Sequence, residues 1–133
     1  MTKTTPLLMF EGKAEEAMNF YISLFGDSKI GKITRYKANE AGPEGSIMHA
    51  IFALNGREYM CIDSPAHHEF TFTPAFSIFV DCESEGEVDR LFEKLSKGGK
   101  VLMPLGAYGF SEKFGWIDDQ YGVSWQINLK KGD

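Results

Sequence analysis

The sequence predicts an α+β fold made of two similar modules, each with the order strand, helix and three strands (βαβββ). Residues 14–25 and 85–96 both have the apolar spacing of an amphipathic helix. Their apolar positions coincide when 71 is added to the residue number, as for Ala17 and Val88. Each helix follows an apolar strand and precedes further strands, which indicates a duplicated unit. We expect a single domain over 1–133, with module one at about 1–66 and module two at about 72–130. A sheet built from two such modules can curl around a cleft.

A turn signal fixes the register within the first module. Asn55-Gly56 lies between two apolar runs, and both central positions of a two-residue hairpin turn need positive φ, which Asn and Gly tolerate. Gly26 is expected to end the first helix. The elements expected in this module are a strand at 5–10, the helix at 14–25, a strand at 28–36, a loop at 37–45, and strands at 46–54 and 57–63.

The second module begins after a connecting loop at 64–74. Ser84 and Glu87 have the spacing of a capping box, and Gly98-Gly99 is expected to end the helix. The other elements expected here are strands at 75–82, 100–103, 112–117 and 123–129, with a Gly- and Pro-rich loop at 104–109 over the cleft.

Composition excludes several classes of partner. The net charge of −5 comes without a basic cluster, which argues against binding of nucleic acid or of an anionic membrane surface. No apolar run reaches the roughly 20 residues that span a bilayer, and the first residues lack the apolar core of a signal peptide. Cys61 and Cys82 lie within apolar runs, so we expect reduced, buried thiols and a cytoplasmic protein.

Several motifs resemble one known group of proteins. The repeat, Phe20-Tyr21-x-x-Leu24 and residues 119–126 (DQYGVSWQ) resemble the vicinal oxygen chelate superfamily, which includes glyoxalase I, bleomycin-binding proteins and extradiol dioxygenases. Residues 10–17 (FEGKAEEA) and 110–116 (FSEKFGW) resemble its PhnB-like members, often labelled 3-demethylubiquinone-9 3-methyltransferase-like. The resemblance implies a glyoxalase-like fold, in which the two modules form a curled mixed sheet around a cleft with the helices outside, and it implies a homodimer.

The resemblance also implies where a metal would bind in the enzymes of the superfamily. Their four ligands, usually His, Glu or Gln, correspond here to Pro6, Met60, Ser77 and Gln126. Pro offers no side-chain donor, a thioether suits soft ions, and one amide cannot hold an ion alone. We therefore expect no metal and predict no cofactor. The sequence also lacks the Gly-rich strand-to-helix motif of a dinucleotide-type cofactor site.

Strand alternation predicts the lining of the cleft. The hairpin turn pairs Ile51 with Met60 and places His49 on the same face. We expect an apolar site with His49 and Gln126 as polar points, and His49 is the best candidate for a catalytic residue, although its role stays unknown. The predicted ligand-binding residues are Leu8, Phe10, His49, Ile51, Met60, Phe79, Phe114, Trp116 and Gln126.

Three classes of function remain open at this point. The leading hypothesis is a protein that binds a small, largely apolar organic ligand in a metal-free cleft, with no assigned reaction. The alternative is a metal-dependent lyase, isomerase or dioxygenase that uses ligands such as His49 and Gln126. A purely structural dimer would instead have a collapsed cleft filled by Phe10, Phe79 and Met60.

Overall fold

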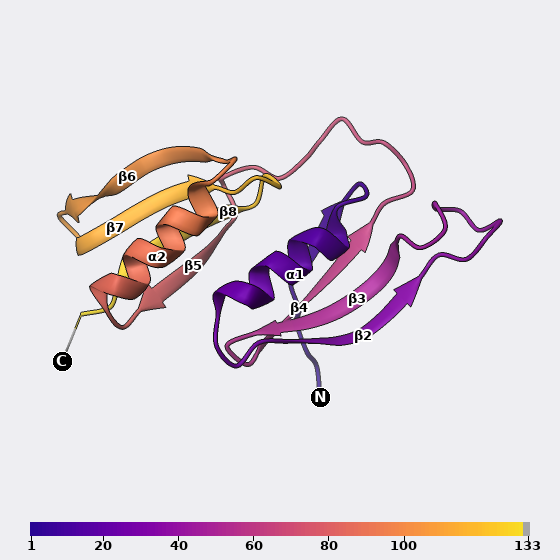
Figure 1. The fold of residues 1–133 in the computed structure, drawn as a ribbon, viewed down its shortest axis with the longest axis horizontal. Coiled ribbons are helices and arrows are strands. Elements are labelled where there is room, and N and C mark those ends of the chain that lie inside the picture. Colours follow the sequence, from indigo (N-terminus) through magenta and orange to yellow (C-terminus); the bar gives the residue numbers. More distant parts are fainter. Residues whose placement is uncertain (132–133) are drawn as a thin grey trace. The chain divides into compact units, whose positions relative to one another are not determined.

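The computed structural model describes residues 1–131 and contains two compact units, one of residues 1–69 (unit 1) and one that begins at Phe70 (unit 2). Each unit has one helix and one four-stranded mixed sheet in the order βαβββ (Figure 1). The predicted α+β class and the duplicated module are therefore confirmed. A cleft shared by the two units stays a prediction.

Unit 1 contains β1 (Leu7–Phe10), α1 (Ala14–Leu24), β2 (Lys29–Arg35), β3 (Ile47–Leu54) and β4 (Arg57–Asp63). The strand order across its sheet is β1-β4-β3-β2, with β1 parallel to β4 and the other neighbours antiparallel. The predicted hairpin is present, because Asn55 and Gly56 have φ values of 51° and 77° and Leu54 pairs with Arg57. This turn fixes which side chains share each face of the sheet.

Unit 2 contains β5 (Ser77–Cys82), α2 (Glu85–Ser96), β6 (Lys100–Tyr108), β7 (Ser111–Asp118) and β8 (Ser124–Leu129). The order β5-β8-β7-β6 repeats that of unit 1, again with a single parallel pair, β5 with β8. The capping hydrogen bond of α2 is as predicted, since the Glu87 amide donates to the Ser84 hydroxyl at 3.2 Å. The Glu87 carboxylate accepts from the amide of Glu83 rather than from that of Ser84.

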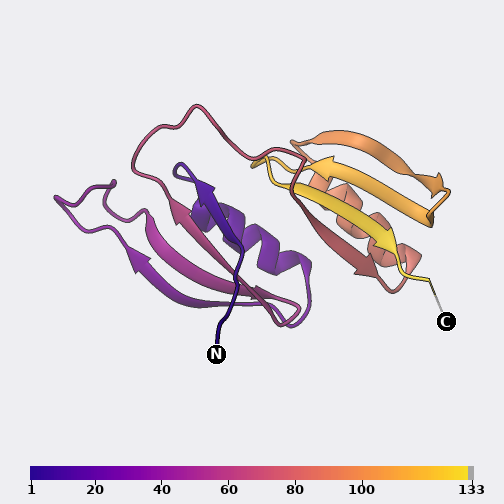
Figure 2. The same cartoon turned by 180° about the vertical axis from the view of Figure 1, so that it is seen from behind.

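Each helix packs on one face of its own sheet. In α1 the side chains of Ala17, Met18 and Tyr21 are buried, and Met18 Sδ lies 3.9 Å from Cys61 Sγ of β4. In α2 the buried residues are Val88, Leu91 and Leu95. Figure 1 shows each helix in front of its sheet, and Figure 2 shows the other side of the strands. The helix-covered faces therefore form the cores of the two units.

Two local predictions are wrong. The segment 104–109 is not a loop over a cleft, because β6 continues to Tyr108 and pairs with β7. Pro104 is tolerated there since β6 is an edge strand whose register shifts three times along the pair. Gly26 does not supply the positive φ after α1, because Phe25 is already extended (φ −124°) and Asp27 takes the left-handed conformation (φ 50°).

A buried carboxylate joins the last strand of unit 1 to the start of its helix. Asp63 is 4% exposed, and its Oδ1 accepts hydrogen bonds from the amides of Gly12 and Ala14 at 2.8 and 2.9 Å. Its Oδ2 accepts from the amide of Ile47 at 3.0 Å. The N-cap residue Lys13 makes no capping bond with its side chain, so Asp63 supplies this function from a distant strand.

We predict that Asp63→Asn destabilises the protein by about 2–4 kcal/mol, because an amide nitrogen cannot accept and one buried N–H loses its partner. Urea denaturation measures the change. Asp27→Asn is the matched control: Asp27 is exposed and left-handed, a conformation that Asn tolerates, so its effect should stay within about 0.5 kcal/mol. Equal effects of the two substitutions would contradict the role of Asp63.

The two cysteines give a second prediction. Both are free and fully buried, and burial raises the pKa of each thiol to about 12. Native protein at pH 8 should therefore resist a disulfide reagent such as dithionitrobenzoate, and two thiols should react once denaturant exposes them. Because the folded pKa lies above the ordinary value of 9.0, this contribution to stability is full below pH 9 and is lost as the pH rises toward 12. Rapid labelling of the native protein would contradict the burial.

Candidate functional site

The side of each sheet that faces away from its helix is called the open face below. Along each strand of unit 1, side chains point alternately to the face covered by α1 and to the open face. Leu7, Met60 and Ile51 are partners across three adjacent strands of this face. Its other members include Met9, His49, Glu58 and Ile62. This surface is therefore mostly aliphatic, with Leu7 46% exposed.

His49 is half-buried on the open face of unit 1. Its Nε2 lies 3.0 Å from the sulfur of Met60, so the two residues share a face as the hairpin register predicts. A thioether is a weak acceptor, and the imidazole keeps its other nitrogen for a stronger partner. His49 can therefore act as one polar point among apolar neighbours, either by donating a hydrogen bond or by accepting one.

The placement of Leu8 and Phe10 in the site is wrong. They pair with Cys61 and Asp63, which lie on the helix-covered face, and they are 4% and 5% exposed. The cause is a connection of three residues between β1 and α1, against two between β5 and α2. Equivalent residues of the two helices differ by 71 in number, but equivalent residues of β1 and β5 differ by 72. Because side chains alternate along a strand, this shift of one residue moves each β1 side chain to the opposite face of the sheet from the predicted one.

The open face of unit 2 is built from rows that cross the four strands. One row contains Phe79 of β5, Gln126 of β8, Trp116 of β7 and Met103 of β6. The row beside it contains Ser77, Ser124 and Asp118, with Lys100 at the end on the edge strand. The third contains Asp81, Asn128, Phe114 and Gly106. Phe79, Phe114, Trp116 and Gln126, four of the predicted ligand-binding residues, thus share one face by register, and their binding of a ligand stays a prediction.

Polar groups on this face are mostly paired with each other. The Trp116 indole N–H donates to the Ser124 hydroxyl at 2.8 Å, and Ser124 and Ser77 share a hydrogen bond of the same length. The Asn128 amide donates to Asp81 at 2.9 Å. Within residues 1–131, the side-chain amide of Gln126 makes no hydrogen bond and the buried Oδ1 of Asp118 has no partner. The half-buried amide of Gln126 is available to a ligand, whereas Asp118 Oδ1 is a buried acceptor beside it.

An aromatic cluster at one end of this face includes two residues that sequence reasoning missed. Phe114 is 2% exposed because Tyr108 and Phe110 pack edge-on against it, with ring centroids 5.9 and 4.9 Å away. Phe79 lies 6.3 Å from the same ring. Tyr108 fell in the segment interpreted as a loop, and Phe110 lay between that segment and the next predicted strand. The apolar residues of 101–108 are interrupted by Pro104 and Gly106, which hid the strand.

The positions that hold a metal in the resembling enzymes offer a poor donor set here. Met60 presents a thioether to His49, and the Ser77 hydroxyl is taken up by Ser124. Pro6 has only its carbonyl group, which accepts from the Met60 amide. Among the residues that the structure describes, no group of three or more His, Cys, Asp or Glu side chains could hold an ion. A divalent metal of the superfamily type does not fit these residues.

The chain was compared with known proteins. The family described as 3-demethylubiquinone-9 3-methyltransferase matches residues 2–128. A solved structure from Bacillus cereus, a PhnB protein provisionally described by the same activity, is 61% identical, with a TM-score of 0.94 over 96% of this chain and 99% of that one. Protein YjdN of Escherichia coli is 24% identical over 96% of this chain and 95% of its own length.

A more distant likeness concerns the fold alone. The fosfomycin resistance protein FosX of Listeria monocytogenes, solved with Mn(II) and a dihydroxypropylphosphonic acid, is 12% identical, with a TM-score of 0.64 over 98% of this chain and 93% of that one. Neither helix of the described residues has the length and apolar character that crossing a bilayer requires.

Proposed function

The chain belongs to the PhnB-like (3-demethylubiquinone-9 3-methyltransferase-like) family of the vicinal oxygen chelate superfamily, and we propose that it binds a small, largely apolar organic ligand without a metal ion. The ligand binds against the open faces of the sheets. The observation that carries this proposal is the exposure of large apolar side chains there, with Phe79 53% and Leu7 46% exposed. Isolated polar groups such as His49 and Gln126 orient the ligand, as is usual in small-molecule sites.

The methyl transfer in the family's name requires a methyl donor such as S-adenosylmethionine. Nucleotide-fold enzymes hold such a cofactor at a Gly-rich turn between a strand and a helix. Here the turn between β1 and α1 (residues 11–13) has one glycine, Gly12, and the turn between β5 and α2 (residues 83–84) has none. Since these residues do not fit that kind of site, the proposal contains no step through this cofactor.

The same proposal includes a homodimer in the cytoplasm. The resemblance to the PhnB-like family supports the dimer, and the two free thiols suit a reducing compartment. Sedimentation equilibrium of the purified protein distinguishes a dimer from a monomer.

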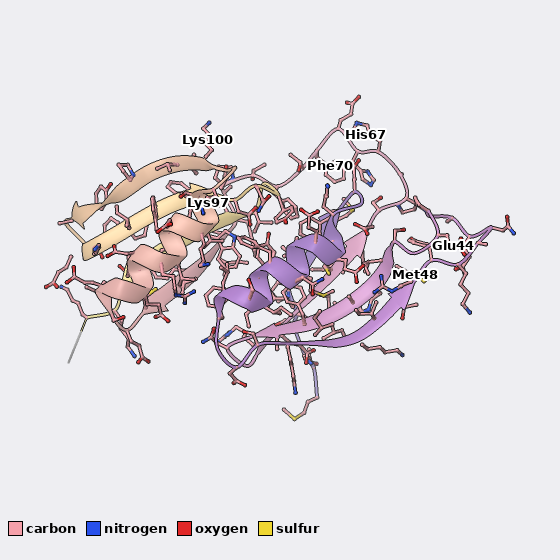
Figure 3. All side chains as sticks on the ribbon, in the orientation of Figure 1. Glu44, Met48, His67, Phe70, Lys97 and Lys100 are labelled. Atoms are coloured by element: carbon pink, nitrogen blue, oxygen red, sulfur yellow. The ribbon has the colours of Figure 1, made fainter. Side chains whose placement is uncertain are left out.

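Ligand binding is tested with N-phenyl-1-naphthylamine, a neutral apolar dye whose emission rises on leaving water. We expect saturable binding. Phe79→Ala should weaken the binding about tenfold because it removes an exposed ring from the open face of unit 2. Phe70→Ala is the matched control: Phe70 is 63% exposed but lies in the segment that connects the units (Figure 3). A dye that does not saturate, or equal losses in both variants, would sink the proposal.

A metal-dependent lyase, isomerase or dioxygenase is the alternative, which the likeness to the Mn(II)-bound FosX fold raises. We expect elemental analysis of the purified protein to find metal well below one equivalent, because a thioether and a hydrogen-bonded serine are poor ligands for hard cations. Stoichiometric Mn, Zn, Ni or Fe, or an activity that a chelator abolishes and added metal restores, would establish the alternative instead.

A further inference from the structure

Gln126 lies at the centre of an aromatic row on the open face of unit 2. Its cross-strand partners are Phe79 on one side and Trp116 on the other. It is half-buried, and its amide makes no hydrogen bond to any residue that the structure describes. A flat molecule lying on this row would contact an aromatic side chain on each side of the amide.

The groups left without a partner around Gln126 include acceptors, because the Gln126 amide has a carbonyl oxygen beside its NH2 group and Asp118 Oδ1 can only accept. The Trp116 N–H is already donated to Ser124, and the Asn128 amide is donated to Asp81. What remains without a partner is the amide of Gln126 and the buried Oδ1 of Asp118. A buried carboxylate oxygen without a hydrogen bond is costly, and a donor from a ligand would relieve that cost.

The charge of the face is negative. Asp81 and Asp118 both belong to its rows, whereas Lys100, the cross-strand partner of Asp118, is exposed and extends away from the sheet (Figure 3). Lys113 points to the other side, where it pairs with Glu85 and Asp89 of α2. An anionic ligand on these rows would therefore meet two carboxylates, while Lys100 lies at the exposed edge of the sheet and forms no ion pair with Asp118.

We infer that this row selects neutral, planar aromatic ligands that carry a hydroxyl or amine hydrogen, and that Gln126 accepts that hydrogen. The inference rests on the proposed function and names its ligand class. Phe79 and Trp116 supply the stacking contacts, while Asp81 and Asp118 reject carboxylates and phosphates. Gln126 is thus a specificity-determining residue rather than a metal ligand.

Three naphthalenes of one shape test the inference. 2-Naphthol is a donor, 2-methoxynaphthalene has no donor, and 2-naphthoate is an anion. Their own fluorescence anisotropy, excited beyond the absorption band of tryptophan, reports binding to the intact protein. We expect 2-naphthol to bind about tenfold more tightly than 2-methoxynaphthalene, the effect of one hydrogen bond, and 2-naphthoate to bind most weakly.

Variants separate the two parts of the inference. Gln126→Leu keeps the size of the side chain and breaks no internal hydrogen bond, so it should fold and should bind 2-naphthol and 2-methoxynaphthalene equally. Asp118→Asn should strengthen binding of 2-naphthoate several-fold, whereas Asp27→Asn, the same charge change in unit 1, should not.

The outcomes distinguish this inference from the proposed function. Binding of all three compounds with equal affinity, or a preference for 2-naphthol that survives Gln126→Leu, overturns the inference and leaves the proposed function standing. Tighter binding of 2-naphthoate than of 2-naphthol also overturns it. If neither the naphthalenes nor N-phenyl-1-naphthylamine binds, the proposed function itself fails.

Discussion

Each four-stranded sheet has two faces but only one helix packed against it, and this constraint decides which side chains are buried and which can meet a ligand. On the covered faces the side chains are fully buried, as Trp125 and Ile127 are in unit 2 and Phe52 is in unit 1. The open face of unit 1 is mostly apolar as well, whereas that of unit 2 combines aromatic rings with polar side chains such as Gln126 and Asn128. Exposed apolar residues on both open faces are surfaces that a bound molecule can cover and leave again.

Buried carboxylates hold the irregular connections in place around these sheets. Asp63 ties the end of β4 to the start of α1 and to β3. Asp119 accepts from the amides of Tyr121 and Val123 and from the Trp125 indole, and so fixes the turn between β7 and β8. Turns held in this way let the strands keep an exact register, and that register aligns Gln126 with Phe79 and Trp116. The polar core thus positions the apolar site.

Much of this arrangement could be predicted from the sequence, because the strongest local signals also set the register. Asn55-Gly56 fixed the pairing of Ile51 with Met60, and the Ser84 cap fixed the start of α2. The failures have definite causes. Pro104 and its neighbouring glycines hid an edge strand that pairs on one side only. Leu8 and Phe10 were assigned to the wrong face because the repeat was aligned on the helices. The apolar spacing within a helix does not reveal how many residues connect it to the strand before it. The packing of Tyr108 and Phe110 against Phe114 depends on that edge strand and was missed with it.

The unequal connections before the two helices limit how the halves can be recombined. A chimera that replaces β1 by β5 but aligns the graft by the helix offset of 71 would invert the grafted strand, because Ile78 rather than Phe79 would replace Leu7 beside Met60. A graft aligned on the last strand residue, with Cys82 in the place of Phe10 and the linker at 11–13 kept, gives the grafted side chains the same sides. A one-residue change in this linker that shifts the strand by one position along the sheet would move core residues into solvent.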